Sequence, residues 1–408
     1  MDYQQTAELE KKFLVHTYDR MPFLAVGGEG CYLHDSTGKK YLDFLGGLAV
    51  NSLGYANPEI MAALRDGSES LLHVSNLIYH PYQGPLAEKL ARLSGLDRAF
   101  FANTGTEAVE GALKLARAYA RKNHPAEPFE KFEILALENS FHGRTFGALS
   151  ATWPEKYRKP FEPLVPGFKF VRLNDVADLR AQFSARTAAI ILEVIQGEGG
   201  VVELSGEFVS AARDLCRAND SLFIADEIQC GLGRTGRYFA YQKFGIKPDV
   251  ALVAKPLAAG LPLAAILTSD AVAQAFAPGM HGTTFGGGPL QCRLALRVLE
   301  IIERPGFLEH VREVGGYFRA QLEKLKEENS IIQTVRGDGL MQAAVLDVPG
   351  KEIVRQAVEA GFLFNCTQEK VLRFLPPLTL ERKHVDELMA GLRPILAAAA
   401  SARKEVNA

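Results

Sequence analysis

The chain has 408 residues, 47% of them hydrophobic and 23% charged, which is typical of a globular protein with about two or three structural units. Its formal net charge of −2 excludes a protein that binds nucleic acid through bulk positive charge. The five cysteines are widely spaced and form no Cys-x-x-Cys motif. We therefore expect a reducing compartment and neither a disulfide framework nor a metal site.

The N-terminus and the longest apolar stretch carry no targeting or membrane signal. Residues 1–12 are polar, and the apolar stretch 250–268 is interrupted by Lys255, Pro256 and Pro262. These patterns predict neither a signal peptide nor a membrane span. We therefore expect a soluble, cytoplasmic protein.

The first two thirds of the chain predict an α/β domain. A short β pair is expected at residues 31–35 and 40–44, around a Ser-Thr-Gly turn. From about residue 100, apolar runs alternate with helical patterns. Strands are predicted at 132–137, 168–173, 188–193, 221–225 and 249–254, and helices at 106–121, 175–185 and 205–219. This alternation indicates a mainly parallel sheet flanked by helices.

The last third of the chain predicts a smaller α+β unit. Its first helix is amphipathic, with apolar residues three or four positions apart at Val311, Val314, Phe318, Leu322 and Leu325. Short strands are expected near 342–347 and 371–375, and a terminal helix at 381–402. Because no Pro/Gly/Ser-rich linker precedes this unit, we expect it to pack closely on the first.

Lys255 and Asp226 are the first candidates for chemistry. Lys255 follows the apolar run 249–254, and Asp226 ends the apolar run that begins at Ser221. Ligands bind at the carboxyl ends of strands in open parallel sheets, so both side chains would emerge at one edge. A desolvated lysine suits Schiff-base chemistry, and a carboxylate that keeps a pyridine nitrogen protonated suits pyridoxal phosphate. A lysine extending to solvent, or a plain salt bridge between the two, is the structural alternative.

A candidate phosphate site begins the helix predicted at 106–121. Residues 104–107 read Thr-Gly-Thr-Glu. Free backbone N–H groups and a hydroxyl at a helix start suit an anion. Thr104 and Glu107 also fit a capping box, and one helix start can serve both purposes.

Residues 231–236 match the G-x-G-x-x-G pattern and raise a nicotinamide-dependent oxidoreductase as an alternative function. The polar residues 226–230 separate these glycines from the preceding strand, and no helical pattern opens after them. We therefore regard the match as chance. A catalytically silent binding protein is a third possibility, against which the presence of both Lys255 and Asp226 argues.

Taken together, the motifs identify a family. From about residue 18 to 395 the chain resembles the class III pyridoxal-phosphate aminotransferases of fold type I, and within them most closely the group that acts on N-acetylornithine. The matching segments, in the family's order, are LDFLGGLAVNSLG, VSNLIYHPYQ, NTGTEAVEGALKLAR, FHGRTFGALSAT, IQGEGGV, FIADEIQCGLGRTG, PDVALVAKPL, HGTTFGG, RGDGLM and LRFLPPL.

The resemblance implies the site residues. Lys255 would be the Schiff-base lysine and the acid/base, and Asp226 would pair with the pyridinium nitrogen. The implied cofactor-binding residues are Gly105, Thr106, Phe141, Asp226, Glu227, Ile228, Gln229, Lys255 and, from the partner subunit of a dimer, Thr284. The implied substrate-binding residues are Arg144 and Thr283 for N-acetylornithine, and Arg373 for glutamate, with Glu198 pairing with Arg373 when that arginine is empty.

The resemblance also implies the reaction and the architecture. The terminal amino group of N-acetylornithine would pass to 2-oxoglutarate, giving N-acetylglutamate 5-semialdehyde and glutamate in arginine biosynthesis. Donors of related enzymes are the alternatives: succinylornithine, succinyl-diaminopimelate, ornithine, 4-aminobutyrate or a carrier-linked lysine precursor. We expect a homodimer with shared active sites. Residues 1–58 would belong to the small domain, 59–294 would form the large cofactor-binding domain, and 295–408 the C-terminal small domain.

Overall fold

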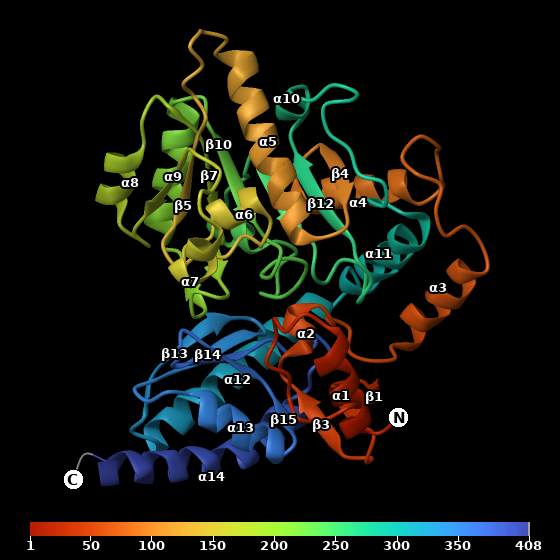
Figure 1. Cartoon of the computed structure of the whole chain (residues 1–408), viewed down its shortest axis with the longest axis vertical. Coiled ribbons are helices and arrows are strands. Elements are labelled where there is room, and N and C mark those ends of the chain that lie inside the picture. The colour runs from red at the N-terminus through yellow and green to blue at the C-terminus, as the bar shows by residue number, and fades with distance from the viewer. Residues whose placement is uncertain (407–408) are drawn as a thin grey trace.

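The computed structural model describes residues 1–406. A seven-stranded sheet lies at the centre of the upper half of the molecule as drawn in Figure 1. β12 runs antiparallel to both of its neighbours, and the other neighbouring strands are parallel. The strands, in order across the sheet, are β4 (Arg98–Ala102), β12 (Ala264–Thr268), β11 (Val250–Val253), β10 (Leu222–Asp226), β7 (Thr187–Leu192), β5 (Glu133–Leu137) and β6 (Phe168–Val171).

Helices cover both faces of this sheet. α5 (Gly105–Asn123) packs on one face, and the other is covered by α4 (Gln83–Ser94), α8 (Val176–Gln182) and α9 (Gly206–Ala218). Successive residues of the central strands enter opposite hydrophobic clusters, as Ile190 and Ile191 of β7 do. Such a sheet must be apolar on both faces, which explains why its strands read as unbroken apolar runs. The predicted strands and helices of this half agree with the structure.

Two strands of this sheet, β4 and β12, were not predicted from the sequence. Residues 250–268 look like one apolar stretch, but β11 ends at Val253 and the chain returns as β12. The remaining helices of this half are α3 (Pro58–Ser68), α6 (Phe146–Ser150), α7 (Glu155–Arg158), α10 (Asp270–Ala273) and α11 (Pro289–Ile302). Shorter elements are β8 (Ile195–Gln196), β9 (Val202–Glu203), η1 (Lys159–Phe161) and η2 (Ala240–Phe244).

The lower half combines both ends of the chain. An antiparallel sheet contains, in order, β13 (Ile332–Asp338), β14 (Met341–Leu346), β17 (Val371–Phe374) and β16 (Asn365–Thr367). The helices of this half are α12 (Phe307–Glu328), α13 (Lys351–Glu359) and α14 (Arg382–Val406). A second sheet joins β1 (Ala25–Glu29), β2 (Tyr32–Asp35) and β3 (Lys40–Asp43) to β15 (Phe362–Leu363).

The parallel pairing of β3 with β15 unites the N-terminal segment with the C-terminal part. α11 is continuous across residue 294, so the predicted boundary at 294/295 falls inside a helix. We propose that this boundary lies after Ile302. No helix within residues 1–406 is long and apolar enough to cross a membrane.

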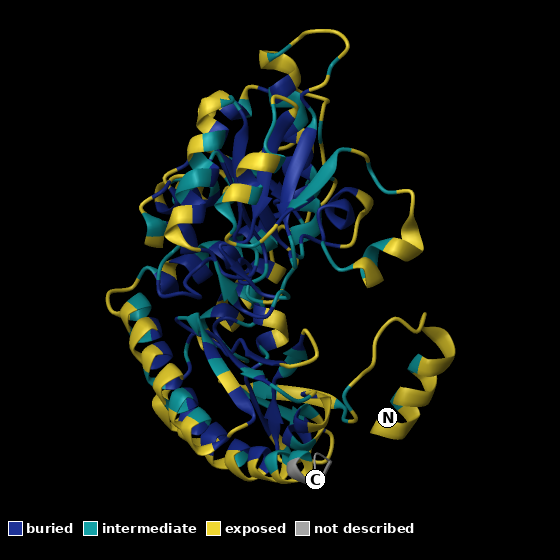
Figure 2. Ribbon diagram, turned by 90° about the vertical axis from the view of Figure 1, so that its left-hand side faces the viewer, coloured by how far each residue is buried: buried dark blue, intermediate teal, exposed yellow. Residues whose placement is uncertain are grey.

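The N-terminal helix α1 (Tyr3–Phe13) stands away from the body of the molecule (Figure 2). It has a capping box between Asp2 and Gln5, but none of its residues is buried. Leu9, Phe13 and Leu14 present apolar side chains to solvent.

A short left-handed turn, α2 (Gly46–Ala49), lies where the two halves meet (Figure 1). All four residues have positive φ, from 56° at Gly46 to 71° at Ala49. Left-handed conformation costs an L-residue about 1–2 kcal/mol, so surrounding contacts must stabilise this turn. The carboxylate of Asp43 accepts hydrogen bonds from the N–H groups of Leu45 and Gly46 and from the Tyr55 hydroxyl.

Glu227, directly after β10, connects that strand to the start of η2. Its buried carboxylate accepts hydrogen bonds from the N–H groups of Ala240 (2.7 Å) and Tyr241 (2.9 Å). Burial raises the pKa of Glu227 to about 7, although these two hydrogen bonds oppose the shift. The residue is therefore expected to influence how stability varies with pH.

Gly46→Ala should lower the free energy of unfolding by more than about 2 kcal/mol. An added Cβ would lie 2.5 Å from the Leu375 carbonyl oxygen, in addition to the cost of positive φ. Gly38→Ala is the matched control, because Gly38 has φ 87° but a Cβ there would meet no heavy atom within 4 Å. Chemical denaturation should show the larger loss at position 46, and equal losses would contradict this account of the turn.

Glu227→Gln should flatten the pH dependence of stability between about pH 4.5 and 7. The folded chain holds the Glu227 proton more tightly than the unfolded chain, whose pKa is near 4.5, so this residue lowers stability as pH rises through that range. The shift corresponds to roughly 3 kcal/mol. Unfolding curves at several pH values should show that the variant's free energy of unfolding rises relative to that of the wild type as pH rises. Parallel pH profiles of the two proteins would contradict the assignment.

Candidate active site

Asp226 and Lys255 meet because they end neighbouring parallel strands. Asp226 pairs with Leu252 across β10 and β11, and Lys255 follows β11 by two residues. Both side chains line one cavity of about 250 Å³. This is the edge at which open parallel sheets bind their ligands.

The Asp226 carboxylate is held from two sides. Its Oδ1 accepts a hydrogen bond from the Ile228 N–H (3.1 Å), and its Oδ2 lies 2.7 Å from Nδ1 of His142. Both side chains are buried. Two fixed partners leave little freedom of rotation, so the carboxylate presents a defined acceptor to the cavity.

Lys255 is a buried amine in a site with charges of both signs. Burial lowers the pKa of its ammonium, and the Arg373 guanidinium acts in the same direction, while Glu198, Glu193 and Asp226 oppose the shift. A lysine with a depressed pKa is more readily neutral, which suits it to act as a nucleophile or a base.

The start of α5 offers an anion site in the same cavity. Thr104 caps the helix and forms a capping box with Glu107. The N–H groups of Gly105 and Thr106 point out of the first turn and have no hydrogen-bond acceptor within the described part of the chain. The hydroxyls of Thr106 and Thr145 lie 2.8 Å apart beside them. The arrangement provides N–H donors, a positive helix end and hydroxyl groups for a phosphate.

Close approach of two loops shapes this anion site. A Cβ on Gly105 would lie 3.0 Å from the Ile228 side chain, and one on Gly143 (φ 138°) would clash with Thr106. Ile228 lines the cavity beneath Gly105. Glycine is therefore required at Gly143, whereas a Cβ at Gly105 would make a tight contact with the Ile228 side chain.

Phe141 and Arg144 form another wall of the cavity. The Arg144 guanidinium carbon lies 3.7 Å from the centre of the Tyr157 ring and 5.5 Å from that of Phe141. Arg144 makes no ion pair with any carboxylate whose side chain the structure describes. A guanidinium held by ring faces keeps its N–H groups free for a ligand carboxylate.

Arg373 is completely buried and contacts two residues that line the cavity, Glu198 and Gln229. Its Nη1 lies 2.7 Å from Glu198 Oε1 and donates to Gln229 Oε1 (3.4 Å), and its Nε donates to Asn365 Oδ1 (3.2 Å). Its Nη2 is buried without a hydrogen-bond partner in the described structure. A buried guanidinium with one free donor is suited to bind a carboxylate that enters the site.

Four residues that the resemblance implied do not line this cavity: Arg373, described above, and Glu227, Thr283 and Thr284. The Glu227 carboxylate is turned toward the first two residues of η2. Thr283 Oγ1 accepts hydrogen bonds from the Asn103 amide and the Gly286 N–H, beside the start of α5. Thr284 is exposed on the same loop.

The structure adds two residues that the sequence reading did not single out. His142 contacts Asp226, and its Nε2 is buried without a hydrogen-bond partner in residues 1–406. Glu193 accepts hydrogen bonds from the N–H groups of Phe141 and Gly197, and burial raises its pKa to about 7. Its place between Phe141 and Arg144 could have identified His142, and Glu193 could have been found as Asp226 was, because it also ends an apolar run.

The glycines at 231–236 serve packing between the two halves. Arg234 in this loop is buried, and its Nη1 donates to the carbonyl oxygens of Leu340 and Pro376. Gly233 and Gly236 adopt positive φ there. No α-helix opens after the loop, so it lacks the geometry of a dinucleotide-binding turn.

Comparisons with known proteins agree with this geometry. The model of the aminotransferase class-III family matches residues 13–396. The acetylornithine aminotransferase of Aquifex aeolicus is 49% identical over 94% of this chain and 100% of its own length, and that of Methanocaldococcus jannaschii is 46% identical over 96% and 98%.

Solved structures give the same result. The acetylornithine aminotransferase of Elizabethkingia anophelis superimposes with a TM-score of 0.86 at 30% identity, covering 98% of this chain and 100% of that one. The ornithine aminotransferase of Toxoplasma gondii gives a TM-score of 0.93 at 31% identity, covering 98% and 96%. Fold, cavity and relatives together place the protein among the class III aminotransferases, and the chain belongs to that family.

Proposed function

We propose that this aminotransferase depends on pyridoxal phosphate and moves the terminal amino group of N-acetylornithine to 2-oxoglutarate. The products are N-acetylglutamate 5-semialdehyde and glutamate, which places the reaction in arginine biosynthesis. The acetylornithine aminotransferases among its relatives support the choice of donor. The observation that carries the proposal is the Glu198–Arg373 pair beside the cavity of Asp226 and Lys255.

The chemistry of the lining residues fits pyridoxal phosphate. Lys255 offers an amine, Asp226 a fixed carboxylate, Phe141 an aromatic wall, and Gly105 and Thr106 an anion site at a helix start. Each matches one part of the cofactor: the aldehyde, the ring nitrogen, the ring face and the phosphate. Bound there, the cofactor supplies an electron sink for the carbon that carries the amine.

Lys255 would transfer protons, and Asp226 would supply a fixed negative charge. Because burial lowers its pKa, Lys255 Nζ gives up a proton more readily than an ordinary lysine and can take one up and return it. Asp226, fixed by Ile228 and His142, holds a negative charge where the cofactor nitrogen would lie. Gln229 and Ile228 line the same cavity and would complete the cofactor site.

Two arginines allow one site to accept two different substrates. Arg144, which makes no ion pair with a described side chain, would bind the carboxylate of the acylated donor, and we assign Thr283 to the same substrate. Arg373 would bind a carboxylate of glutamate or 2-oxoglutarate. Because an unpaired buried charge is costly, Glu198 would pair with Arg373 while the donor is bound and release it for the acceptor.

A panel of amines with 2-oxoglutarate as acceptor tests this function. We expect kcat/KM for N-acetylornithine to exceed that for free ornithine, 4-aminobutyrate and the succinylated donors.

Lys255→Ala should lower turnover by at least about a thousandfold and abolish the yellow absorbance of the bound cofactor. Preference for free ornithine would refute the assigned donor, and an active, yellow Lys255→Ala variant would refute the mechanism.

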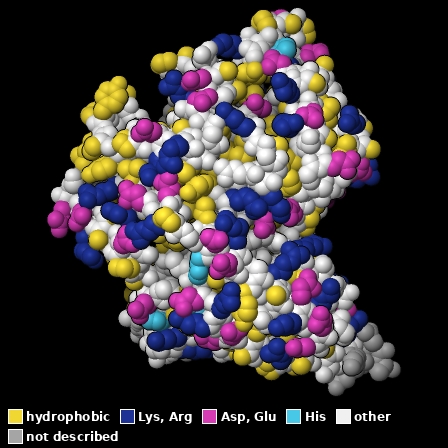
Figure 3. Space-filling model, turned by 180° about the vertical axis from the view of Figure 1, so that it is seen from behind, with side chains coloured by type: hydrophobic (Ala, Val, Ile, Leu, Met, Phe, Trp, Pro, Cys, Tyr) yellow, Lys and Arg dark blue, Asp and Glu magenta, His cyan; other side chains and the backbone are white. Residues whose placement is uncertain are grey.

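We further propose that two copies of the chain pair through the exposed apolar segment 71–79. Leu72, Leu77, Ile78 and Tyr79 are all more than half exposed, in a segment that extends from the body of the molecule. Apolar side chains gather over the large domain on the face drawn in Figure 3. An apolar cluster of this kind favours a protein partner. Pairing would also explain why Thr284 is exposed, since it could then reach the phosphate of the partner's cofactor.

Ile78→Asp should convert a dimer into a monomer, because it introduces a charge into the proposed interface. Phe161→Asp is the control, since Phe161 is an exposed apolar residue in a different segment, η1. Light scattering should give a dimeric mass for the wild type and the control and a monomeric mass for Ile78→Asp. A fully active wild-type monomer would reject the proposal.

A further inference from the structure

Glu193 is a buried carboxylate that lines the active-site cavity and has no role in the proposed function. It directly follows β7, and Leu192, the last residue of that strand, pairs with Ala225 of β10. Three neighbouring strands therefore carry titratable side chains at the same edge: Glu193 after β7, Asp226 at the end of β10 and Lys255 after β11. The roles of the second and third are assigned, and that of Glu193 follows from its contacts.

Both oxygens of the Glu193 carboxylate accept hydrogen bonds from the main chain. Oε1 accepts from the N–H of Phe141 (2.9 Å), and Oε2 accepts from the N–H of Gly197 (3.1 Å). Burial raises the pKa of Glu193, and these two hydrogen bonds oppose that shift. A carboxylate that is bound through both oxygens links the two segments that supply the N–H groups.

One of the linked segments is the loop that binds the donor in the proposed function. Phe141 forms a wall of the cavity, and Arg144, three residues later, would bind the donor's carboxylate. The guanidinium carbon of Arg144 lies 5.5 Å from the centre of the Phe141 ring. The position of the Phe141 main chain therefore determines where both the ring wall and this guanidinium lie.

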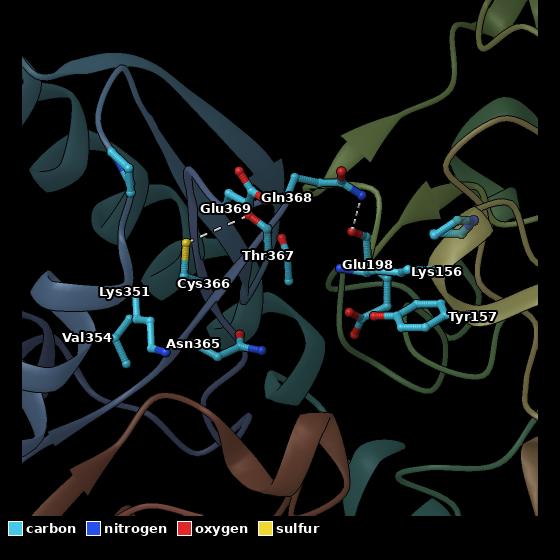
Figure 4. A pocket seen from close by; sticks show the side chains of 12 residues that line it. Lys156, Tyr157, Glu198, Lys351, Val354, Asn365, Cys366, Thr367, Gln368 and Glu369 are labelled. Carbon is cyan, nitrogen blue, oxygen red and sulfur yellow. Dashed lines mark hydrogen bonds between the residues drawn. The ribbon is translucent and has the colours of Figure 1, made fainter. Parts of the chain in front are cut away.

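The other linked segment carries Glu198, which would cover Arg373 while the donor is bound. Gly197 immediately precedes Glu198, whose main-chain carbonyl oxygen accepts a hydrogen bond from the Gln368 side chain (3.0 Å; Figure 4). The main chain around Glu198 is thus held on both sides, whereas its side chain is 29% exposed. A fixed main chain with a partly exposed side chain suits a carboxylate that leaves one arginine and returns to it.

We propose that Glu193 is a positioning residue that holds both of these segments in place for the donor. The inference rests on the proposed function and extends it to a residue that determines the preference for N-acetylornithine over glutamate. N-acetylornithine leaves Arg373 without a substrate carboxylate, so its binding requires Glu198 to be in place, because an unpaired buried charge is costly. Glutamate binds Arg373 after Glu198 has left, so a loosely held Glu198 does not weaken its binding.

Rapid mixing of the yellow holoenzyme with either amine tests this role, because both amines convert the same yellow form. The loss of absorbance gives a second-order rate constant for each amine. Glu193→Gln keeps the shape of the side chain but replaces one acceptor oxygen by an NH₂ group, so it loses one of the two links. We expect the ratio of the rate constants, N-acetylornithine over glutamate, to fall about five- to tenfold.

Asp43→Asn is the matched control for this change. Asp43 is also a buried carboxylate that accepts hydrogen bonds from two main-chain N–H groups, those of Leu45 and Gly46, but it does not line the active-site cavity. Both variants should lose stability, whereas only Glu193→Gln should change the ratio. An unchanged ratio in Glu193→Gln, or an equal fall in both variants, would overturn the role.

Hydrogen exchange of the holoenzyme measures the two links without catalysis. In Glu193→Gln, mass spectrometry should show faster amide exchange in a peptide that contains Phe141 or Gly197, because one of these N–H groups loses its acceptor. Asp43→Asn should leave the exchange of both peptides unchanged. Wild-type exchange of both peptides in Glu193→Gln would contradict the proposed links.

Glu193→Asp provides the test if the glutamine variant does not fold. It keeps the charge and both oxygens but draws them back by one methylene group, so it cannot reach both N–H groups at once. The ratio of the rate constants should then fall about two- to fivefold. A folded Glu193→Asp variant with the wild-type ratio would rule out the role.

Failure of this role and failure of the proposed function give different results. If the wild type reacts faster with free ornithine than with N-acetylornithine, the proposed function fails. If N-acetylornithine is the better donor but Glu193→Gln keeps the wild-type ratio, the function stands and the role of Glu193 is wrong.

Discussion

The parallel pairing of β10 with β11 is the constraint on which the site depends. It places Asp226 beside Leu252 and brings Lys255 out of the sheet at the same edge. The α/β arrangement then puts the start of α5 and the loop that carries Phe141 and His142 around that edge. A slip of one residue between the strands would turn one of the two side chains away from the cavity.

The buried charges are the second organising feature, because each depends on the others. Lys255 and Arg373 face three carboxylates, those of Asp226, Glu193 and Glu198. Removing one charge would leave another unpaired in a dry environment, which is more costly than the intact set. In such a site a cation can change from one carboxylate partner to another while the net charge of the site stays the same. This property is what a site for two substrates with different numbers of carboxylates requires.

The sequence predicts the central sheet well because a sheet covered on both faces leaves unbroken apolar runs. It predicts Asp226 and Lys255 for the same reason, since each ends such a run. The strand β12 and the left-handed turn at 46–49 escape prediction, because long-range pairing and the contacts of Asp43 determine them. His142 and Tyr157 also escape, since their roles arise from contacts with Asp226 and Arg144 that only the folded chain creates.

The central claim is that Lys255 and Asp226 hold one cofactor between two strand ends. Borohydride reduction of the yellow protein, followed by peptide mass mapping, tests it most directly because reduction fixes the cofactor to the amine that carries it. The account predicts the added mass on the peptide that contains Lys255, with the other lysines unmodified. Modification of a different lysine, or a yellow protein that gains no mass at Lys255, would contradict it.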